Sequence, residues 1–184
     1  MPRIPPLPED EWDDEVRPIL EVEPNTLTGR LGDNNIFSTL ARHPGLFKPW
    51  LRFGGFLLAG GVLPAREREL LILRTGLNCG SPYEWGQHVR IAEEGLGMPR
   101  EEIMRVAEGP DADGWSEADA TLLRAADELH AHAKIGDETW AALAEAYDER
   151  ALIEIVMVVG NYHLVAFALN SLGVELDEGL EGLP

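Results

Sequence analysis

The apolar and polar positions of residues 64–97 predict two helices joined by a short polar turn. The first helix is expected to begin at Pro64 and to end at Gly76, because proline suits a first helical position and glycine suits a helix end. It contains four consecutive apolar residues, which predicts burial on nearly all sides. The second helix is expected to begin at Ser81 and Pro82, a serine cap followed by a proline.

The rest of the chain also shows helical periodicity, and no segment reads as a strand of convincing length. Helices are predicted at residues 8–20, at 34–43, at 46–61 with a kink at Pro49, at 99–109, at 116–134, at 137–147 and at 148–171. The one at 116–134 opens with Ser116 and Asp119, a pattern that resembles a capping box. The pattern therefore predicts an all-α fold.

The length of 184 residues is that of a single domain with a genuine core. Residues 1–33 are expected to form an extended arm with a short helix, with residues 23–33 as loop. Residues 34–172 are expected to form a single-domain helical bundle, and residues 173–184 an acidic tail at the surface.

The net charge of the chain argues against two classes of binding partner. The chain carries 33 acidic against 15 basic residues, a net charge of −18, which argues against binding to nucleic acid or to an anionic membrane surface. The single cysteine cannot form an internal disulfide, the N-terminus lacks the apolar core of a signal peptide, and no run approaches 18 apolar residues. We therefore expect a soluble, cytoplasmic protein.

The two predicted helices of residues 64–97 contain the candidate catalytic residues. Glu69 lies on an apolar stripe, so its carboxylate needs a partner or a raised pKa. A structural ion pair with Arg66 or Arg74 is the alternative to a catalytic role for it. Glu84 and His88 are four residues apart on the second helix, where their side chains can meet. If the two helices pack together, these three residues supply carboxylates and an imidazole between apolar walls, which proton-transfer chemistry needs.

Four further residues have both a functional and a structural interpretation. Arg74 can bind a substrate carboxylate or cap its helix, and Trp85 can contact a substrate or pack in the core. Tyr83 can donate to a developing oxyanion or pack in the core. Cys79 is a turn thiol with a possible redox role.

A metal site is not predicted. Two carboxylates and the histidine of the helix pair would be a plausible ligand set, but the strong helical signature of two histidines with a glutamate between them is absent. His130 and His132 are two apart on a helix and face different ways, and His163 has no convincing partner in the sequence.

Three runs carry a family resemblance: RELLILR at 68–74, YEWGQH at 83–88 and IAEEGLG at 91–97. They resemble the carboxymuconolactone decarboxylase family, which includes the alkylhydroperoxidase D-like proteins. Residues 3–8, 37–64 and 160–180 also resemble that family, so the likeness covers nearly the whole chain. It implies an alkylhydroperoxidase D-like helical fold, assembly as a homo-oligomer (dimer, trimer or hexamer) and no cofactor.

The chain departs from the redox-active members. These carry a Cys-x-x-Cys pair whose second cysteine lies four residues before the motif histidine, with a glutamate upstream. When His88 and Glu69 are aligned with them, Ser81 and Glu84 occupy the two cysteine positions, and Cys79 lies two residues too early. A dithiol cycle needs a resolving cysteine, so this chain cannot close one by itself.

The resemblance therefore implies a decarboxylase-like enzyme acting on a small carboxylated lactone or keto acid by acid–base chemistry. His88 would transfer the proton that replaces CO₂ on carbon, and Glu69 or Glu84 would orient it. Arg74 would hold the carboxylate, and Tyr83 would stabilise the enolate. Two alternatives stay open: peroxide reduction through the lone thiol with an external thiol, and a non-catalytic ligand-binding oligomer.

Overall fold

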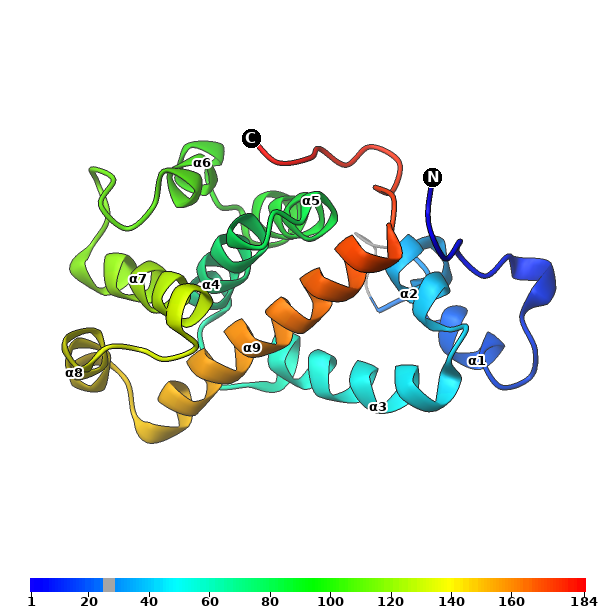
Figure 1. Cartoon of the computed structure of the whole chain (residues 1–184), viewed down its shortest axis with the longest axis horizontal. Helices are drawn as coiled ribbons and strands as arrows, with labels where there is room; N and C mark the ends of the chain where they lie inside the picture. The colour runs from blue at the N-terminus through cyan, green and yellow to red at the C-terminus, as the bar shows by residue number, and fades with distance from the viewer. Residues whose placement is uncertain (25–28) are drawn as a thin grey trace.

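The computed structural model describes residues 1–24 and 29–184, and over these ranges it is all-α, as the pattern predicted (Figure 1). Its α-helices are α1 Arg17–Leu20, α2 Asn35–Leu40, α3 Pro44–Gly55, α4 Ala65–Asn78, α5 Pro82–Arg90, α6 Arg100–Glu108, α7 Glu117–His132, α8 Asp137–Ala146 and α9 Glu149–Leu172. Single π-helical turns, Phe56–Gly60 and Ile91–Gly95, extend α3 and α5. Short 3₁₀ turns occur at Glu9–Glu11 and Leu31–Asp33.

Helix α4 is the centre of the fold, and it contacts α5, α6, α7 and α9. Leu71 and Ile72 point into a core built with α7 and α9, whereas Leu70 and Leu73 point into a second core built with α5 and α6. All four side chains are completely buried. The prediction of a helix buried on nearly all sides is confirmed, and a carboxylate placed on α4 is consequently held rigidly between two apolar layers.

The predicted end of this helix at Gly76 was wrong, because α4 continues to Asn78. Gly76 is buried where α5 crosses α4, and a Cβ there would lie 3.4 Å from the Cβ of Glu84 and 3.4 Å from the backbone nitrogen of Trp85. The missing side chain therefore serves close helix packing rather than termination. The chain reverses two residues after α4, at Gly80, which has a left-handed φ of +57°.

The N-terminal helix predicted at 8–20 is divided into the 3₁₀ turn and α1. The carboxylate of Asp13 accepts the backbone N–H groups of Glu15 and Val16 at 2.9 and 3.0 Å, which starts a new turn there. The extended arm contacts the C-terminal end of α9, where the backbone N–H groups of Arg3 and Ile4 donate to the carbonyl of Leu172. The loop expected at 23–33 falls partly outside the described residues.

The C-terminal tail is anchored through one half-buried carboxylate. Asp177 accepts hydrogen bonds from the Tyr83 hydroxyl at 2.6 Å, from the backbone N–H of Asn35 at 2.8 Å and from the Gln87 amide. The tail then passes so close to α5 that a Cβ on Gly86 would collide with the carbonyl of Glu181. This contact fixes the tail across the outer side of α5.

Helix α9 crosses the molecule diagonally (Figure 1). It carries apolar residues on both its buried and its exposed sides. Its length and mean hydropathy of 1.9 would allow it to span a membrane, but half of that window is buried within the fold. The core helices of soluble proteins pass the same test of length and composition. The cytoplasmic location stays a prediction.

The outer side of α9 carries an exposed apolar stripe made by Ile153, Met157, Leu164 and Phe167, whose relative exposures run from 43% to 63%. Their spacing of three, four or seven residues keeps them on one face. Contiguous exposed apolar surface of this kind marks interaction sites. Homo-oligomerisation stays a prediction, and this stripe is where we expect the subunit contact.

Replacing Gly86 with alanine is expected to destabilise the protein by about 1–3 kcal/mol, because the new Cβ forces the tail away from α5. Urea unfolding measures the change. Gly55→Ala is the matched control, since that helical glycine has open space around its Cβ and the substitution should be neutral or stabilising. Equal effects of the two substitutions would contradict the assigned role of the Gly86 contact.

Leu164→Glu is expected to reduce the molecular mass of the particle in solution, because it places a charge in the middle of the α9 stripe. Light scattering after size exclusion measures this mass. Ala141→Glu, at an exposed position of α8, should leave it unchanged. A wild-type particle of monomer mass would refute the prediction of an oligomer.

Candidate active site

Two buried carboxylates hold one buried imidazole between α4 and α5. The Nδ1 atom of His88 lies 2.6 Å from Oε2 of Glu69, and its Nε2 atom lies 3.2 Å from Oε1 of Glu84. All three residues are at most 5% exposed. The structure therefore brings the three predicted catalytic residues into a single chain of contacts, which we call the Glu–His–Glu triad.

Local sequence explains each position of the triad. Glu69 lies in the middle of α4, on the side where α5 packs, and Glu84 and His88 share a face of α5 one turn apart. Gly76 allows the two helices to approach closely enough for the contact across them. The ring of Tyr162 on α9 packs edge-on against the imidazole, with ring centroids 5.0 Å apart, and closes one wall.

The charges of the triad fix the protonation of its imidazole. Burial by itself lowers the pKa of His88, but the adjoining carboxylates of Glu69 and Glu84 outweigh it and raise that pKa to about 10. The imidazole is consequently a cation at neutral pH. The second oxygen of Glu69, Oε1, is buried without a hydrogen-bond partner among residues 1–24 and 29–184. A site with a held proton and an open acceptor is suited to proton transfer.

Cys79 adjoins this site without joining the triad. Burial, and secondarily the charge of Glu84, raise the pKa of its thiol to about 11. The group is therefore a thiol rather than a thiolate at neutral pH, and a thiol is a poor nucleophile.

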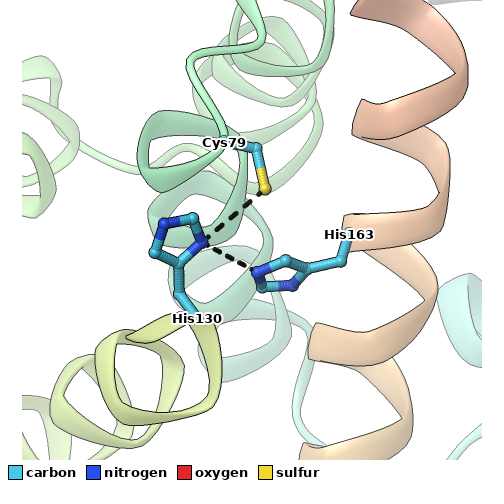
Figure 2. Close-up of side chains that lie close together, drawn as sticks. All are labelled: Cys79, His130 and His163. Carbon is cyan, nitrogen blue, oxygen red and sulfur yellow. Dashed lines mark hydrogen bonds between the residues drawn. The ribbon is translucent and has the colours of Figure 1, made fainter. Parts of the chain in front are cut away.

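A second cluster surrounds this thiol, and sequence reasoning missed it (Figure 2). Nδ1 of His130 lies 4.0 Å from Sγ of Cys79 and 3.0 Å from Nε2 of His163. The three side chains come from the end of α4, the last turn of α7 and the middle of α9. They are far apart along the chain and no spacing rule joins them, so no signal in the sequence could have found this cluster.

Tyr83 does not face the triad. Its hydroxyl donates to Asp177 and accepts from the backbone N–H of Ile36 at 3.2 Å and from the Gln87 amide at 3.1 Å. The burial of this hydroxyl, followed by the charge of Asp177, raises its pKa well above the usual range. The predicted role in stabilising an enolate therefore has no geometric support, and the residue instead secures the tail.

Trp85 and Arg74 also have structural positions. The indole of Trp85 is 1% exposed in the core between α4 and α6. The guanidinium of Arg74 makes two bonds to Asp127, at 2.6 and 2.8 Å, and donates to the carbonyls of Val106 and Ala107. With its donors engaged by α6 and α7, Arg74 is unsuited to the predicted capture of a substrate carboxylate.

Arg68, which sequence reasoning overlooked, is a better candidate for that role. It adjoins Glu69 on α4, and its positive charge acts on the hydroxyl of Tyr162, the residue that walls the triad. Its guanidinium Nε is buried and has no hydrogen-bond partner in the described part of the chain. A buried, unpaired cationic donor close to the triad suits an anionic ligand.

A large apolar groove lies elsewhere on the molecule. It has a volume of about 730 Å³ and runs between α2, α3 and α9, with Phe47, Trp50 and Leu169 in its lining. None of the triad residues lines this groove. Size alone would make it the first choice for a ligand site, but the reactive groups favour the triad.

Comparison with known proteins agrees with the sequence motifs. Residues 44–128, which contain the whole triad, match the carboxymuconolactone decarboxylase family. No curated protein sequence matches the chain.

Solved structures share the fold at low sequence identity. The debrominase Bmp8 in complex with 2,3,4-tribromopyrrole is 18% identical, with a TM-score of 0.80 over 95% of this chain and 91% of its own. A peroxidase-related protein from a Silicibacter species is 17% identical, with a TM-score of 0.79 over 92% of this chain and 88% of its own. The alkylhydroperoxidase AhpD core of a Ralstonia eutropha protein is 18% identical, with a TM-score of 0.69 over 95% and 93%.

Identities this low establish the fold and leave the reaction open. Residues 44–128 are therefore similar to the carboxymuconolactone decarboxylase family, and the chain shares the all-α fold of the alkylhydroperoxidase D-like proteins.

Proposed function

We propose that the protein is an enzyme that catalyses cofactor-free proton transfer, in the form of decarboxylation of a small carboxylated lactone or keto acid. The observation that carries the proposal is the imidazolium of His88 held between two buried carboxylates, at 2.6 and 3.2 Å. A buried triad of this kind is costly for stability, so its chemistry is the better explanation for its presence.

The reaction requires one proton. When the carbon–carbon bond to the carboxylate breaks, CO₂ leaves and the electron pair stays on the substrate as an enolate. The imidazolium of His88 supplies the proton that forms the new C–H bond, directly or through the carboxylate of Glu84 beside its Nε2. Glu69 holds the other ring nitrogen and keeps the imidazole oriented. Water then restores the proton.

Substrate binding requires a cation near the triad, because the substrate is an anion. Arg68 replaces Arg74 in this role, since Arg74 is engaged by Asp127 whereas the Nε of Arg68 is buried and unpaired in the described ranges. The edge of Tyr162 against the imidazole supplies an apolar wall that limits water.

Peroxide reduction through Cys79 is the alternative that the peroxidase-related neighbour suggests. The raised pKa of this thiol and the absence of a second cysteine in the sequence both weigh against it. Thiol-dependent peroxide consumption that disappears in Cys79→Ser would restore it. Binding of carboxylated lactones without turnover would instead favour the non-catalytic ligand-binding alternative.

His88→Gln and Glu84→Gln are expected to lower the rate of CO₂ release by about 10²–10⁴-fold, because each removes a member of the proton path. The assay is CO₂ release across a panel of carboxylated lactones and β-keto acids. His43→Gln, at an exposed histidine outside the triad, is the control and should keep wild-type activity. Normal turnover by His88→Gln would refute the mechanism.

The raised pKa of His88 predicts a pH dependence of stability. Its charged form is favoured in the folded protein, so this stabilisation is complete below the ordinary histidine pKa of about 6.5 and is lost as pH rises through about 10. Urea midpoints between pH 7 and 10 and NMR titration of the imidazole measure the effect. In Glu69→Gln the pKa of His88 should fall towards the ordinary histidine value. A wild-type His88 that titrates near 6.5 would contradict the charged triad.

A further inference from the structure

We propose that Cys79, His130 and His163 form a binding site for a transition-metal ion of the zinc class. The thiol sulfur and one nitrogen of each ring all lie within 4.8 Å of one another. Figure 2 shows the three side chains converging from α4, α7 and α9 on one point between them. This site is separate from the triad, and the proposal does not depend on the proposed reaction.

Two of the three distances between ligand atoms are within about 0.5 Å of those in a tetrahedral site. With Zn–S near 2.3 Å and Zn–N near 2.0–2.1 Å, neighbouring sulfur and nitrogen ligands lie about 3.5 Å apart and two nitrogens about 3.3 Å apart. Here the Cys79 sulfur is 4.0 Å from Nδ1 of His130, and this nitrogen is 3.0 Å from Nε2 of His163. The third pair, the Cys79 sulfur and the His163 nitrogen, lies within 4.8 Å, so an ion would have to draw these two side chains closer together.

The tautomer of His163 supports the assignment. Its Nδ1 atom lies 2.8 Å from the carbonyl oxygen of Val159, which can only accept, so Nδ1 carries the hydrogen. In the neutral ring the lone pair is therefore on Nε2, and this atom is the one that faces the cluster. A ring N–H held by a backbone carbonyl is the usual outer-shell arrangement of a metal-binding histidine.

The chemical types of the three ligands indicate which metal ion the site would bind. One thiolate and two imidazoles suit Zn²⁺, and Co²⁺ serves as its spectroscopic substitute, whereas carboxylate-preferring ions such as Mg²⁺ and Ca²⁺ find no oxygen ligand among the three residues. Binding would convert the thiol of Cys79 to a metal thiolate and release its proton to water. Three protein ligands would leave a fourth coordination position for water.

The site would also connect three elements. Cys79 follows the last residue of α4, His130 lies in the last turn of α7 and His163 lies in the middle of α9. The turn that holds the cysteine is already fixed by Asn170 of α9, whose amide donates to the Cys79 carbonyl at 2.9 Å. An ion bound there would stabilise the folded protein, because the ligands come together only after folding.

To test the proposal, the full chain is freed of any affinity tag. It is then titrated with ZnCl₂ in a calorimeter and with CoCl₂ in a spectrophotometer. We expect one ion per chain, a rise in melting temperature and a thiolate-to-cobalt charge-transfer band. In Cys79→Ser the band should vanish. In His163→Ala the affinity should fall by more than the roughly 10–100-fold that follows loss of an outer-shell partner.

His132→Ala is the matched control, because this exposed histidine lies two residues from His130 and outside the cluster. It should bind the ion like the wild type. Zn²⁺ should also protect Cys79 of the wild type from alkylation by iodoacetamide, which reports on the thiolate independently of any enzyme assay. Circular dichroism checks that each variant is folded.

Three results would overturn the proposal. The first is a wild-type protein that binds neither ion and shows no charge-transfer band. The second is unchanged affinity in both Cys79→Ser and His163→Ala, and the third is an equal loss in His132→Ala. In each case the 3.0 Å contact between His130 and His163 would be an ordinary hydrogen bond between rings.

Discussion

The close approach of α4 and α5 at Gly76 is the constraint on which the rest of the structure depends. It sets the helix pair so that the carboxylate of Glu69 meets the imidazole of His88 at 2.6 Å inside the core. Because α4 is packed on both sides by apolar clusters, neither helix can shift without opening a core. The geometry of the triad is therefore a consequence of helix packing rather than of loop conformation.

The triad brings an electrostatic cost into this packed region. Two carboxyl groups and one imidazolium lie together with almost no exposure to water. Replacing a buried charged cluster with well-packed apolar residues often leaves the stability of a protein unchanged or increases it. The cost is offset in part because each ring nitrogen of His88 has a carboxylate beside it, and this arrangement also keeps the proton on the ring at neutral pH.

The surroundings of Cys79, which lies beside the triad, differ from the paired cysteines that a dithiol peroxidase needs. Where the redox-active members of the family that the sequence resembles carry the second motif cysteine, this chain has Glu84, whose carboxylate contacts the imidazole of His88. Cys79, two residues outside that pattern, meets His130 and His163 in a cluster of its own. The carboxylate that contacts His88 and the thiol that lies beside two other histidines therefore belong to separate clusters.

The sequence by itself determined the all-α fold, the buried α4 and the pairing of Glu84 with His88, because helical periodicity and one-turn spacing are local properties. It also indicated Glu69, because a carboxylate on an apolar helical stripe needs a partner. Only the tertiary structure decided which contacts each long side chain makes: Arg74 binds Asp127, and Cys79 meets two histidines from distant helices. These outcomes depend on how separate helices pack, and packing of distant elements leaves no periodic signal along the chain.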